Sequence, residues 1–314
     1  IDHLVVSHND ADHIGGNAAI IDYYETEADG IGAIYDPGIA ASTQTYQGYL
    51  DAVEEHDVTL YETREGDSIQ FDGVDVQVLG PPEPYLESEA RNENSLVLRL
   101  SYGETSFLLT GDAEDDQEAY LVEQYGQQLN ATVLKAGHHG SSSSTSEGLL
   151  DAVRPQAVVI SSPYDSQYGH PAEEMLERLA TRSIPTYWTA THGDIVFVSN
   201  GTAVSVQTQQ AAPTDPSTLR DGEPIEPGTG GDVVERDRIV AESGTVTEPV
   251  ATDGGGGNLG IEQIHADAEG DDRENLNGEY VVFRNDGESE LDLTGWTVTD
   301  EVGKTYTFPD GFTL

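Results

Sequence analysis

Four side chains that can bind a metal ion lie within six positions near the start of the sequence. They are His8, Asp10, Asp12 and His13, and they follow a short apolar run at residues 4–6. Imidazole nitrogens and carboxylate oxygens are the ligands that divalent cations use in hydrolytic sites. The pattern predicts a metal site where a strand ends and a helix begins. The alternative is an acidic turn with two surface histidines, in a chain rich in aspartate.

A further candidate ligand is Asp112, which follows the strand-like run 107–110 and Gly111. A carboxylate at the edge of a sheet can bridge two cations. Taken alone, a Gly-Asp pair after a strand is more often a turn or a helix cap. Its place after the first histidine segment makes the bridging role the preferred interpretation.

Histidines supply the remaining candidates. His138 and His139 are adjacent and follow a predicted strand, so we expect them to point in different directions, with only one acting as a ligand. His170 precedes Pro171 at the start of a predicted helix, and it is either a ligand, a group facing the substrate or a simple cap. Lys135 is one of two lysines in the chain and is predicted to contact a phosphate.

These segments resemble the metallo-β-lactamase superfamily. Residues 8–13 match its His-x-His-x-Asp-His signature, with Asp10 in place of the second histidine. The aspartate variant and the string Leu-Lys-Ala-Gly-His-His-Gly-Ser at 134–141 look most like the hydrolase domain of the ComEC competence proteins. The resemblance implies an α/β fold, in which two sheets form an αββα sandwich covered by helices on both outer faces.

The resemblance also implies roles for individual residues. Two cations would share Asp112, with His8, Asp10 and His138 holding one ion, and Asp12, His13 and His170 holding the other. The implied catalytic groups are Asp12, which orients the attacking water, and Lys135 and His139, which contact the phosphoryl oxygens. His139 is the rival of His138 as a ligand. Residues 92–98 lack the histidine that many members carry there, so one site should be weaker or richer in oxygen, with zinc or manganese as the expected ions.

Three regions differ in pattern. Residues 1–209 alternate strands and helices and are the predicted hydrolase domain, with its first strands missing because the chain reads as a fragment cut at both ends. Residues 210–257 are acidic and rich in glycine and proline, which predicts a flexible linker with room for one short helix at 233–241. Residues 258–314 are strand-like and resemble the N-terminal part of a lamin-tail domain, an immunoglobulin-like sandwich.

Hydrophobic periodicity places the elements of the first region. The predicted helices cover residues 16–27, 46–55, 113–125, 145–153 and 171–182. One predicted strand ends at residue 6. The others cover residues 58–61, 68–71, 74–79, 95–100, 105–110, 132–135, 156–161, 185–188, 194–198 and 202–206.

Acidic residues dominate the composition. The chain has 59 acidic and 13 basic residues, a net charge of −46, and no cysteine. Charge spread along the whole chain is typical of proteins adapted to high salt, where the screening length falls to about 3 Å, so we expect a halophilic archaeal source. At such salt the charge neither favours nor excludes a phosphodiester substrate. Disulfides and thiolate ligands are excluded, and no run approaches the roughly 18–20 apolar residues of a membrane span.

The expected function is metal-dependent hydrolysis, as in a ComEC-type nuclease that acts on DNA outside the cytoplasm, in an extracellular or cell-surface location. One alternative keeps the site but hydrolyses a small ester, lactone or β-lactam. Another is a non-catalytic adhesion or DNA-holding protein. The lamin-tail part is expected to bind a surface or a protein partner, and the oligomeric state is left open.

Overall fold

The chain forms two compact units, Ile1–Thr245 and Val246–Leu314. The computed structural model describes residues 1–86, 90–241, 259–265, 280–285, 291, 293–294, 296–299, 305–309 and 311–314. In this part of the chain, no helix combines the length and the apolar character needed to cross a membrane.

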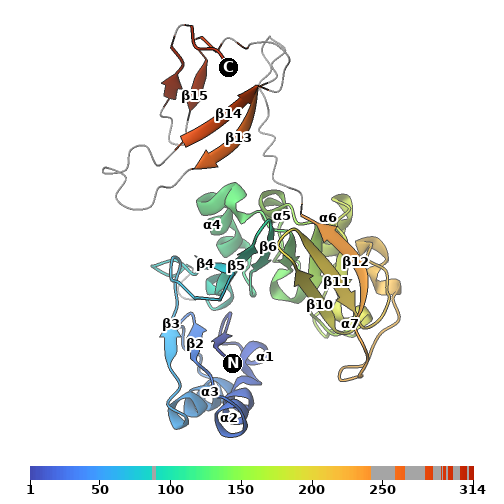
Figure 1. The fold of residues 1–314 in the computed structure, drawn as a ribbon. Helices are drawn as coiled ribbons and strands as arrows, with labels where there is room; N and C mark the ends of the chain where they lie inside the picture. Colours follow the sequence, from blue (N-terminus) through green and yellow to red (C-terminus); the bar gives the residue numbers. More distant parts are fainter. Residues whose placement is uncertain are drawn as a thin grey trace. The chain divides into compact units, whose positions relative to one another are not determined.

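The N-terminal part of the first unit is a small parallel sheet with helices packed on it (Figure 1). Its strands, in spatial order, are β1 (His3–Val5), β2 (Ala33–Asp36) and β3 (Leu60–Glu62). Its helices are α1 (Ala11–Ile14), α2 (Asn17–Glu27) and α3 (Gln44–Glu55). Ile14, Ile21, Ile34 and Tyr49 are fully buried between these layers. This core fixes α1, which carries part of the first histidine segment.

A six-stranded sheet forms the centre of the first unit. Its strands, in spatial order, are β4 (Asp75–Gly80), β5 (Val97–Tyr102), β6 (Thr105–Leu109), β7 (Val133–Lys135), β8 (Ala157–Ile160) and β9 (Thr186–Trp188). Pairing is antiparallel from β4 to β6 and parallel from β6 to β9. The carboxyl ends of β6, β7 and β8 therefore meet at one edge of the sheet. Asp112 follows β6 closely, and His138 and His139 follow β7 closely.

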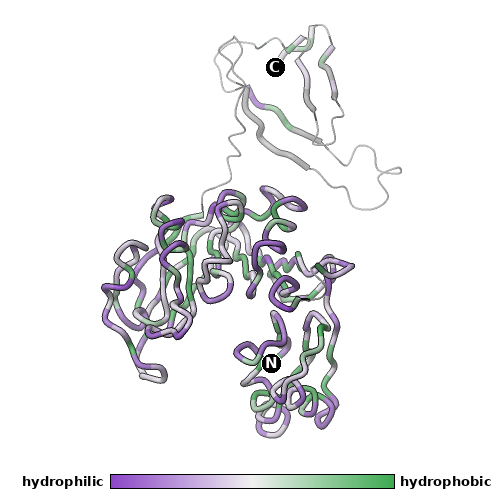
Figure 2. Tube along the Cα trace, turned by 180° about the vertical axis from the view of Figure 1, so that it is seen from behind, coloured by the Kyte–Doolittle hydropathy of each residue, from purple (hydrophilic) through white to green (hydrophobic). Residues whose placement is uncertain are grey.

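Helices and short 3-10 turns cover this sheet. They are η2 (Asn92–Asn94), α4 (Asp115–Tyr125), η3 (Gly126–Leu129), η4 (Gly137–Gly140), α5 (Glu147–Val153), α6 (Glu173–Thr181) and α7 (Thr189–His192). The largest buried cluster lies between them and the sheet, with Leu108, Leu134, Leu149 and Trp188 completely inaccessible to solvent. Hydrophobic residues gather in the strands, whereas the outer helices and loops are largely hydrophilic (Figure 2).

A third sheet is antiparallel and contains β10 (Ile195–Ser199), β11 (Ala203–Thr208) and β12 (Val234–Val240). The predicted turn between its first two strands is confirmed. The side-chain oxygen of Asn200 accepts hydrogen bonds from the backbone N–H groups of Thr202 and Ala203, and Gly201 has φ +89°.

The linker prediction is wrong for residues 210–241. Residues 216–221 form η5 (Pro216–Asp221), and Leu219 is completely buried in the main core. The short helix for which the sequence left room at 233–241 does not form, because β12 pairs with β11 through the backbone. Backbone pairing and the buried Pro216 and Leu219 hold a segment whose composition alone predicts a flexible linker. Residues 242–257, the rest of the expected linker, lie outside the described residues.

Truncating Leu219 tests whether this segment belongs to the fold. We expect Leu219→Ala to lower the free energy of unfolding by about 2–5 kcal/mol, because it opens a cavity in the core. Thr218→Ala, at an exposed neighbour, should change it by less than about 0.5 kcal/mol. Urea denaturation followed by circular dichroism measures both variants. Equal stabilities would mean that η5 does not support the core.

The regular elements in the described parts of the second unit are all strands. β13 (Leu259–His265) pairs with β14 (Tyr280–Asn285), and β15 (Thr297–Thr299) pairs with β16 (Thr305–Thr307), both antiparallel. Phe308 is buried among aromatic rings, with its centroid 5.7 Å from that of Phe283 and 4.9 Å from that of Phe312. The predicted all-β architecture of this unit is confirmed.

Candidate metal centre

The first histidine segment lies directly after β1. His8 is buried, with 1% of its surface exposed, and Asp10 is the residue before the first turn of α1. The Asp10 side chain makes no capping bond to that helix, and it accepts a hydrogen bond from Nε of Arg91 instead. Asp12 and His13 lie within α1 itself. One strand end and one helical turn thus present all four side chains of the segment.

Asp112 follows β6 through a glycine that no other residue could replace without strain. Gly111 has φ +58°, and a Cβ there would lie 2.8 Å from the Cβ atoms of both Ser7 and Ser95. The backbone N–H of Asp112 donates to Oγ of Ser95. Gly111 therefore lets the end of β6 approach the first histidine segment closely.

His138 and His139 both have left-handed backbone conformations, with φ of 44° and 56°. Such a conformation is unfavourable for residues other than glycine, and it is concentrated at functional sites. Two left-handed residues in succession turn both imidazoles toward Asp112, with His138 Nε2 3.8 Å and His139 Nε2 3.6 Å from its Oδ2. The two side chains do not diverge as expected, because both Nε2 atoms approach Asp112; which of the two binds a metal ion stays a prediction.

Four imidazoles surround one oxygen of Asp112. The distances from Oδ2 are 3.1 Å to His13 Nε2, 3.6 Å to His139 Nε2 and 3.8 Å to the Nε2 atoms of His8 and His138. Two ligand atoms that share one cation, each about 2.1 Å from it, lie about 3.0–3.4 Å apart. The observed spacing is close to that of a metal site in which Asp112 is central.

The other aspartates lie on different sides of this cluster. Asp12 Oδ2 is 3.3 Å from His139 Nε2 and 3.7 Å from His13 Nε2. Ligand atoms of these three residues and Asp112 all lie within 4.8 Å of one another. Asp10 Oδ2 is instead 3.9 Å from His8 Nε2. The cluster therefore has two halves that meet at Asp112.

Residues 1–162, just over half of the chain, match the family model described as the metallo-beta-lactamase superfamily. The chain belongs to this superfamily. Residues 253–314 match the lamin tail domain, so both resemblances in the sequence are confirmed.

Curated relatives of this superfamily member carry the first unit within longer chains. This chain is 30% identical to ComE operon protein 3 of Bacillus subtilis over 197 residues, and 35% identical to competence protein ComA of Neisseria gonorrhoeae over 198 residues. It is also 31% identical to recombination protein 2 of Haemophilus influenzae over 195 residues. These matches cover 62–63% of this chain, which spans about a quarter of the length of each relative.

Hydrogen bonds at Nδ1 orient the two histidines of η4 in this superfamily site. His138 Nδ1 donates to Glu114 Oε1 at 2.7 Å, and His139 Nδ1 donates to the carbonyl oxygen of Ser161 at 3.0 Å. An imidazole that donates from Nδ1 keeps an electron pair on Nε2, which is the form that binds a metal. The acceptors Glu114 and Ser161 thus leave both Nε2 atoms able to bind a cation.

Ser7 performs the same task for the other two histidines. Its Oγ lies 3.2 Å from His8 Nδ1 and 3.1 Å from His13 Nδ1. A hydroxyl oxygen has two electron pairs and can accept from both rings. Neither Ser7 nor Glu114 was identified from the sequence, although each is adjacent or close to a predicted ligand.

The donor set fits a divalent cation. His8 Nε2 is buried and has no hydrogen-bond partner among the described residues. Burial and the neighbouring His13 lower the pKa of His8 to about 4, so its imidazole is neutral at physiological pH. A buried polar atom without a partner is unfavourable, and a cation beside Asp112 would satisfy it.

Asp112 supplies the negative charge of the centre. Burial raises the pKa of this carboxyl, but the hydrogen bond from His13 and the charges of His13, His8 and His139 outweigh that effect. The resulting pKa of Asp112 is about 2, so it is ionised at neutral pH. A carboxylate among imidazoles is a donor set that suits a divalent cation.

His170 and Lys135 lie at the margin of the cluster. The His170 ring is 5.6 Å from the His138 ring, and His170 is not among the residues whose ligand atoms lie together. Lys135 Nζ donates to the carbonyl oxygen of Ala136, while burial lowers its pKa and the charge of Asp112 raises it. The roles predicted for His170 and Lys135 therefore stay predictions.

Three other histidines interact elsewhere in the structure. His3 Nε2 lies 2.8 Å from the carbonyl oxygen of Gln70, and His56 pairs with Asp22 at 2.9 Å. His192 is buried, with Nδ1 3.1 Å from the backbone nitrogen of Trp188.

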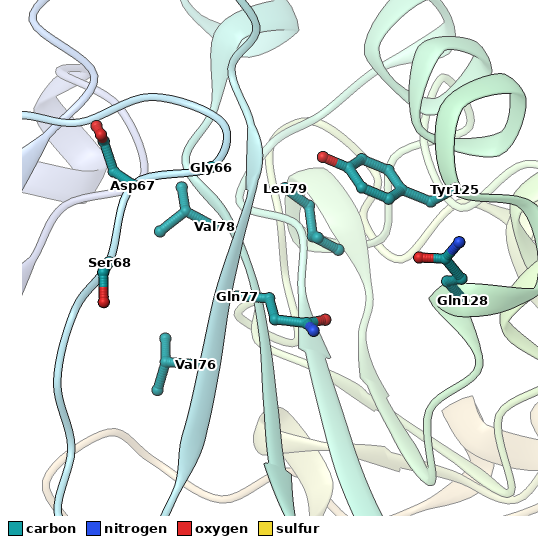
Figure 3. Close-up of a pocket in the computed structure, with 9 residues that line it drawn as sticks. All are labelled: Gly66, Asp67, Ser68, Val76, Gln77, Val78, Leu79, Tyr125 and Gln128. Atoms are coloured by element: carbon teal, nitrogen blue, oxygen red, sulfur yellow. The ribbon is translucent and has the colours of Figure 1, made fainter. Parts of the chain in front are cut away.

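A separate pocket of about 330 Å³ lies beside β4 (Figure 3). Its lining residues are Gly66, Asp67, Ser68, Val76, Gln77, Val78, Leu79, Tyr125 and Gln128. No histidine lines it, and Asp67 is its one carboxylate. These side chains cannot build a metal site, so the histidine cluster is the candidate centre.

Substituting Glu114 tests how much its hydrogen bond with His138 contributes to metal binding. Besides His138, Glu114 Oε1 accepts a bond from Ser143 Oγ at 3.0 Å. We expect Glu114→Ala to weaken metal binding or activity about 10- to 100-fold, as for other groups that orient metal ligands. Glu114→Gln keeps an acceptor for Nδ1 and should lose less.

The matched control is Asp115→Ala, at the exposed carboxylate next along the chain. Metal titration followed by calorimetry compares the variants. An affinity of Glu114→Ala equal to that of the control would show that His138 needs no such support.

Proposed function

We propose that this chain is a metal-dependent phosphodiesterase that hydrolyses DNA outside the cytoplasm. The observation that supports it is the set of four imidazole nitrogens around Oδ2 of Asp112, between 3.1 and 3.8 Å away. We further propose that the centre holds two divalent cations, zinc or manganese, with Asp112 shared between them.

The contact of His8 with Asp10, and those of Asp12 with His13 and His139, suggest two sets of ligands, and we assign His138 to the first. His8, Asp10 and His138 would hold one cation, and Asp12, His13 and His139 would hold the other. His139 thus takes the place for which His170 was considered. The set that contains Asp10 is the weaker one, because Asp10 is also engaged by Arg91.

The chain's own groups complete the chemistry. When bound, a divalent cation acts as a Lewis acid and lowers the pKa of water from 15.7 to about 7. Asp12 is 65% exposed at its side chain, so it can accept a hydrogen bond from the attacking water and orient it. The negative charge of Asp112 raises the pKa of Lys135, so the two side chains interact electrostatically. The positive charge of Lys135 would offset the negative charge of the acidic groups beside the reacting phosphate.

The substrate class is proposed from the relatives. Proteins named as competence and recombination proteins carry a similar first unit, which favours DNA as the substrate. The lamin tail domain is proposed to attach the enzyme to a surface or a protein partner.

The test is an activity panel with the metal-loaded protein, in dilute buffer and in multimolar KCl. Single-stranded DNA, duplex DNA, a generic ester, a lactone and a β-lactam are offered, each with and without a chelator. We expect chelator-sensitive cleavage of DNA and little turnover of the others. Turnover of the ester, lactone or β-lactam without DNA cleavage would overturn the proposal that DNA is the substrate. Failure to bind any metal would overturn the proposal that the protein is a metal-dependent enzyme.

A further inference from the structure

Tyr168 is the most exposed large hydrophobic side chain in the described part of the chain, with 75% of its surface accessible. Single exposed hydrophobic residues are common on protein surfaces and need no explanation by themselves. The position of Tyr168 near the candidate metal centre indicates a role in binding the substrate.

A short series of rings connects Tyr168 with the centre. The Tyr168 and His170 rings are 5.9 Å apart, with 31° between their planes. The His170 ring is 5.6 Å from the His138 ring, and His138 Nε2 is 3.8 Å from Asp112. The exposed face of Tyr168 therefore lies two ring contacts from the proposed ligand His138.

The turn that carries Tyr168 is held by its own hydrogen bonds. The backbone N–H of Tyr168 donates to Oγ of Ser166, and that of Gly169 donates to the carbonyl oxygen of Ser166 at 3.0 Å. Gly169 has φ +77°, which allows the sharp reversal. Tyr168 is thus presented on a defined turn.

Arg220 of η5 fixes the other side of this turn. Its Nη2 donates to the carbonyl oxygens of Gly169, at 3.2 Å, and Pro171, at 2.6 Å. Its guanidinium lies 5.4 Å from the ring centroid of the buried Trp188, and its own carbonyl oxygen accepts from the hydroxyl of Tyr164. A segment anchored in the core therefore holds Tyr168 in place.

Charge limits how this protein can hold a polyanion. With 59 acidic and 13 basic residues, it can offer few of the phosphate contacts that usually give nucleic-acid affinity. Stacking of a base on an aromatic ring needs no positive charge and tolerates any sequence. Bases of a duplex are already stacked and paired with each other, so a protein ring can take one at the lowest energetic cost from a single strand.

We propose that Tyr168 stacks on a base of a single-stranded nucleic acid whose neighbouring phosphodiester lies at the metal centre. The inference rests on the proposed function and adds that the preferred substrate is single-stranded. It assigns to Tyr168 the role of a substrate-binding group.

The test compares two labelled strands of equal charge, a thymidine 12-mer and a 12-mer of abasic deoxyribose phosphates. Binding to the manganese-loaded protein is measured by fluorescence anisotropy at 4 °C, with strand integrity checked afterwards. We expect the wild type to bind the thymidine strand at least about fivefold more tightly. Tyr168→Ala should lose this preference, and Tyr168→Phe should keep it.

Two controls make the result specific. Tyr23→Ala changes another exposed tyrosine, 58% accessible and located in α2, and should keep the preference. Metal analysis of Tyr168→Ala should match the wild type. A preference that survives in Tyr168→Ala, or one absent from the wild type, overturns the inference. Base-dependent binding without cleavage of any strand overturns the phosphodiesterase proposal alone.

Discussion

Asp112→Asn is expected to reduce kcat/KM for DNA cleavage by at least about 1,000-fold. The substitution keeps the shape of the side chain but removes the negative charge at the point where four imidazole nitrogens meet. Electrostatic stabilisation by a metal centre is worth several kcal/mol, and each 1.36 kcal/mol is a factor of ten in rate. Elemental analysis should show that the variant retains less than the wild-type metal content.

The matched control is Asp115→Asn, which changes an exposed carboxylate three positions away. It should retain both activity and metal. Near-ultraviolet circular dichroism verifies that Asp112→Asn is folded. A folded Asp112→Asn variant with wild-type activity would mean that this carboxylate has no part in the reaction, and a binding or adhesion role would then be favoured.

The second large effect is expected at His139. We expect His139→Ala to reduce activity about 100-fold or more and to release one of two bound cations, because its Nε2 lies beside Asp12, His13 and Asp112. His170→Ala, at the neighbouring ring outside this group, should keep both cations. Metal content and activity are measured on the same preparations. The opposite result, with metal lost from His170→Ala and kept in His139→Ala, would restore the assignment expected from the sequence.

Most regular elements of the first unit could be predicted from sequence periodicity. The helices α2, α3, α4, α5 and α6 lie within a few residues of their predicted ranges. Their apolar spacing reflects one face packed on a sheet, which a local pattern records. The resemblance to the metallo-β-lactamase superfamily supplied the fold class, which periodicity alone could not.

The errors in the fold arose where tertiary pairing outweighs local pattern. The strand β2 was not predicted, although it is the central strand of the N-terminal sheet. The strand predicted at 68–71 forms only two isolated bridges, at Ser68 and Phe71. The strand β12 exists because β11 offers a free edge, a fact that its own charged sequence does not contain.

The types of residue at the site were predictable, but their geometry was not. The spacing predicted His8, Asp12, His13 and Asp112 as metal ligands, and the structure brings these side chains together. The left-handed backbone at 138–139 reverses the rule that adjacent side chains diverge. Glu114, Ser7 and Arg91 could not be assigned, because their roles depend on contacts between segments distant in the sequence.

Anomalous scattering from crystals grown with manganese tests the two-cation centre most directly. We predict two peaks about 3.5–4 Å apart, one on each side of Asp112. One peak should be bonded to His8 and His138, and the other to His13 and His139. Peaks that lie elsewhere, or a map with none within bonding distance of Asp112, would contradict the assignment of this cluster as a catalytic metal centre.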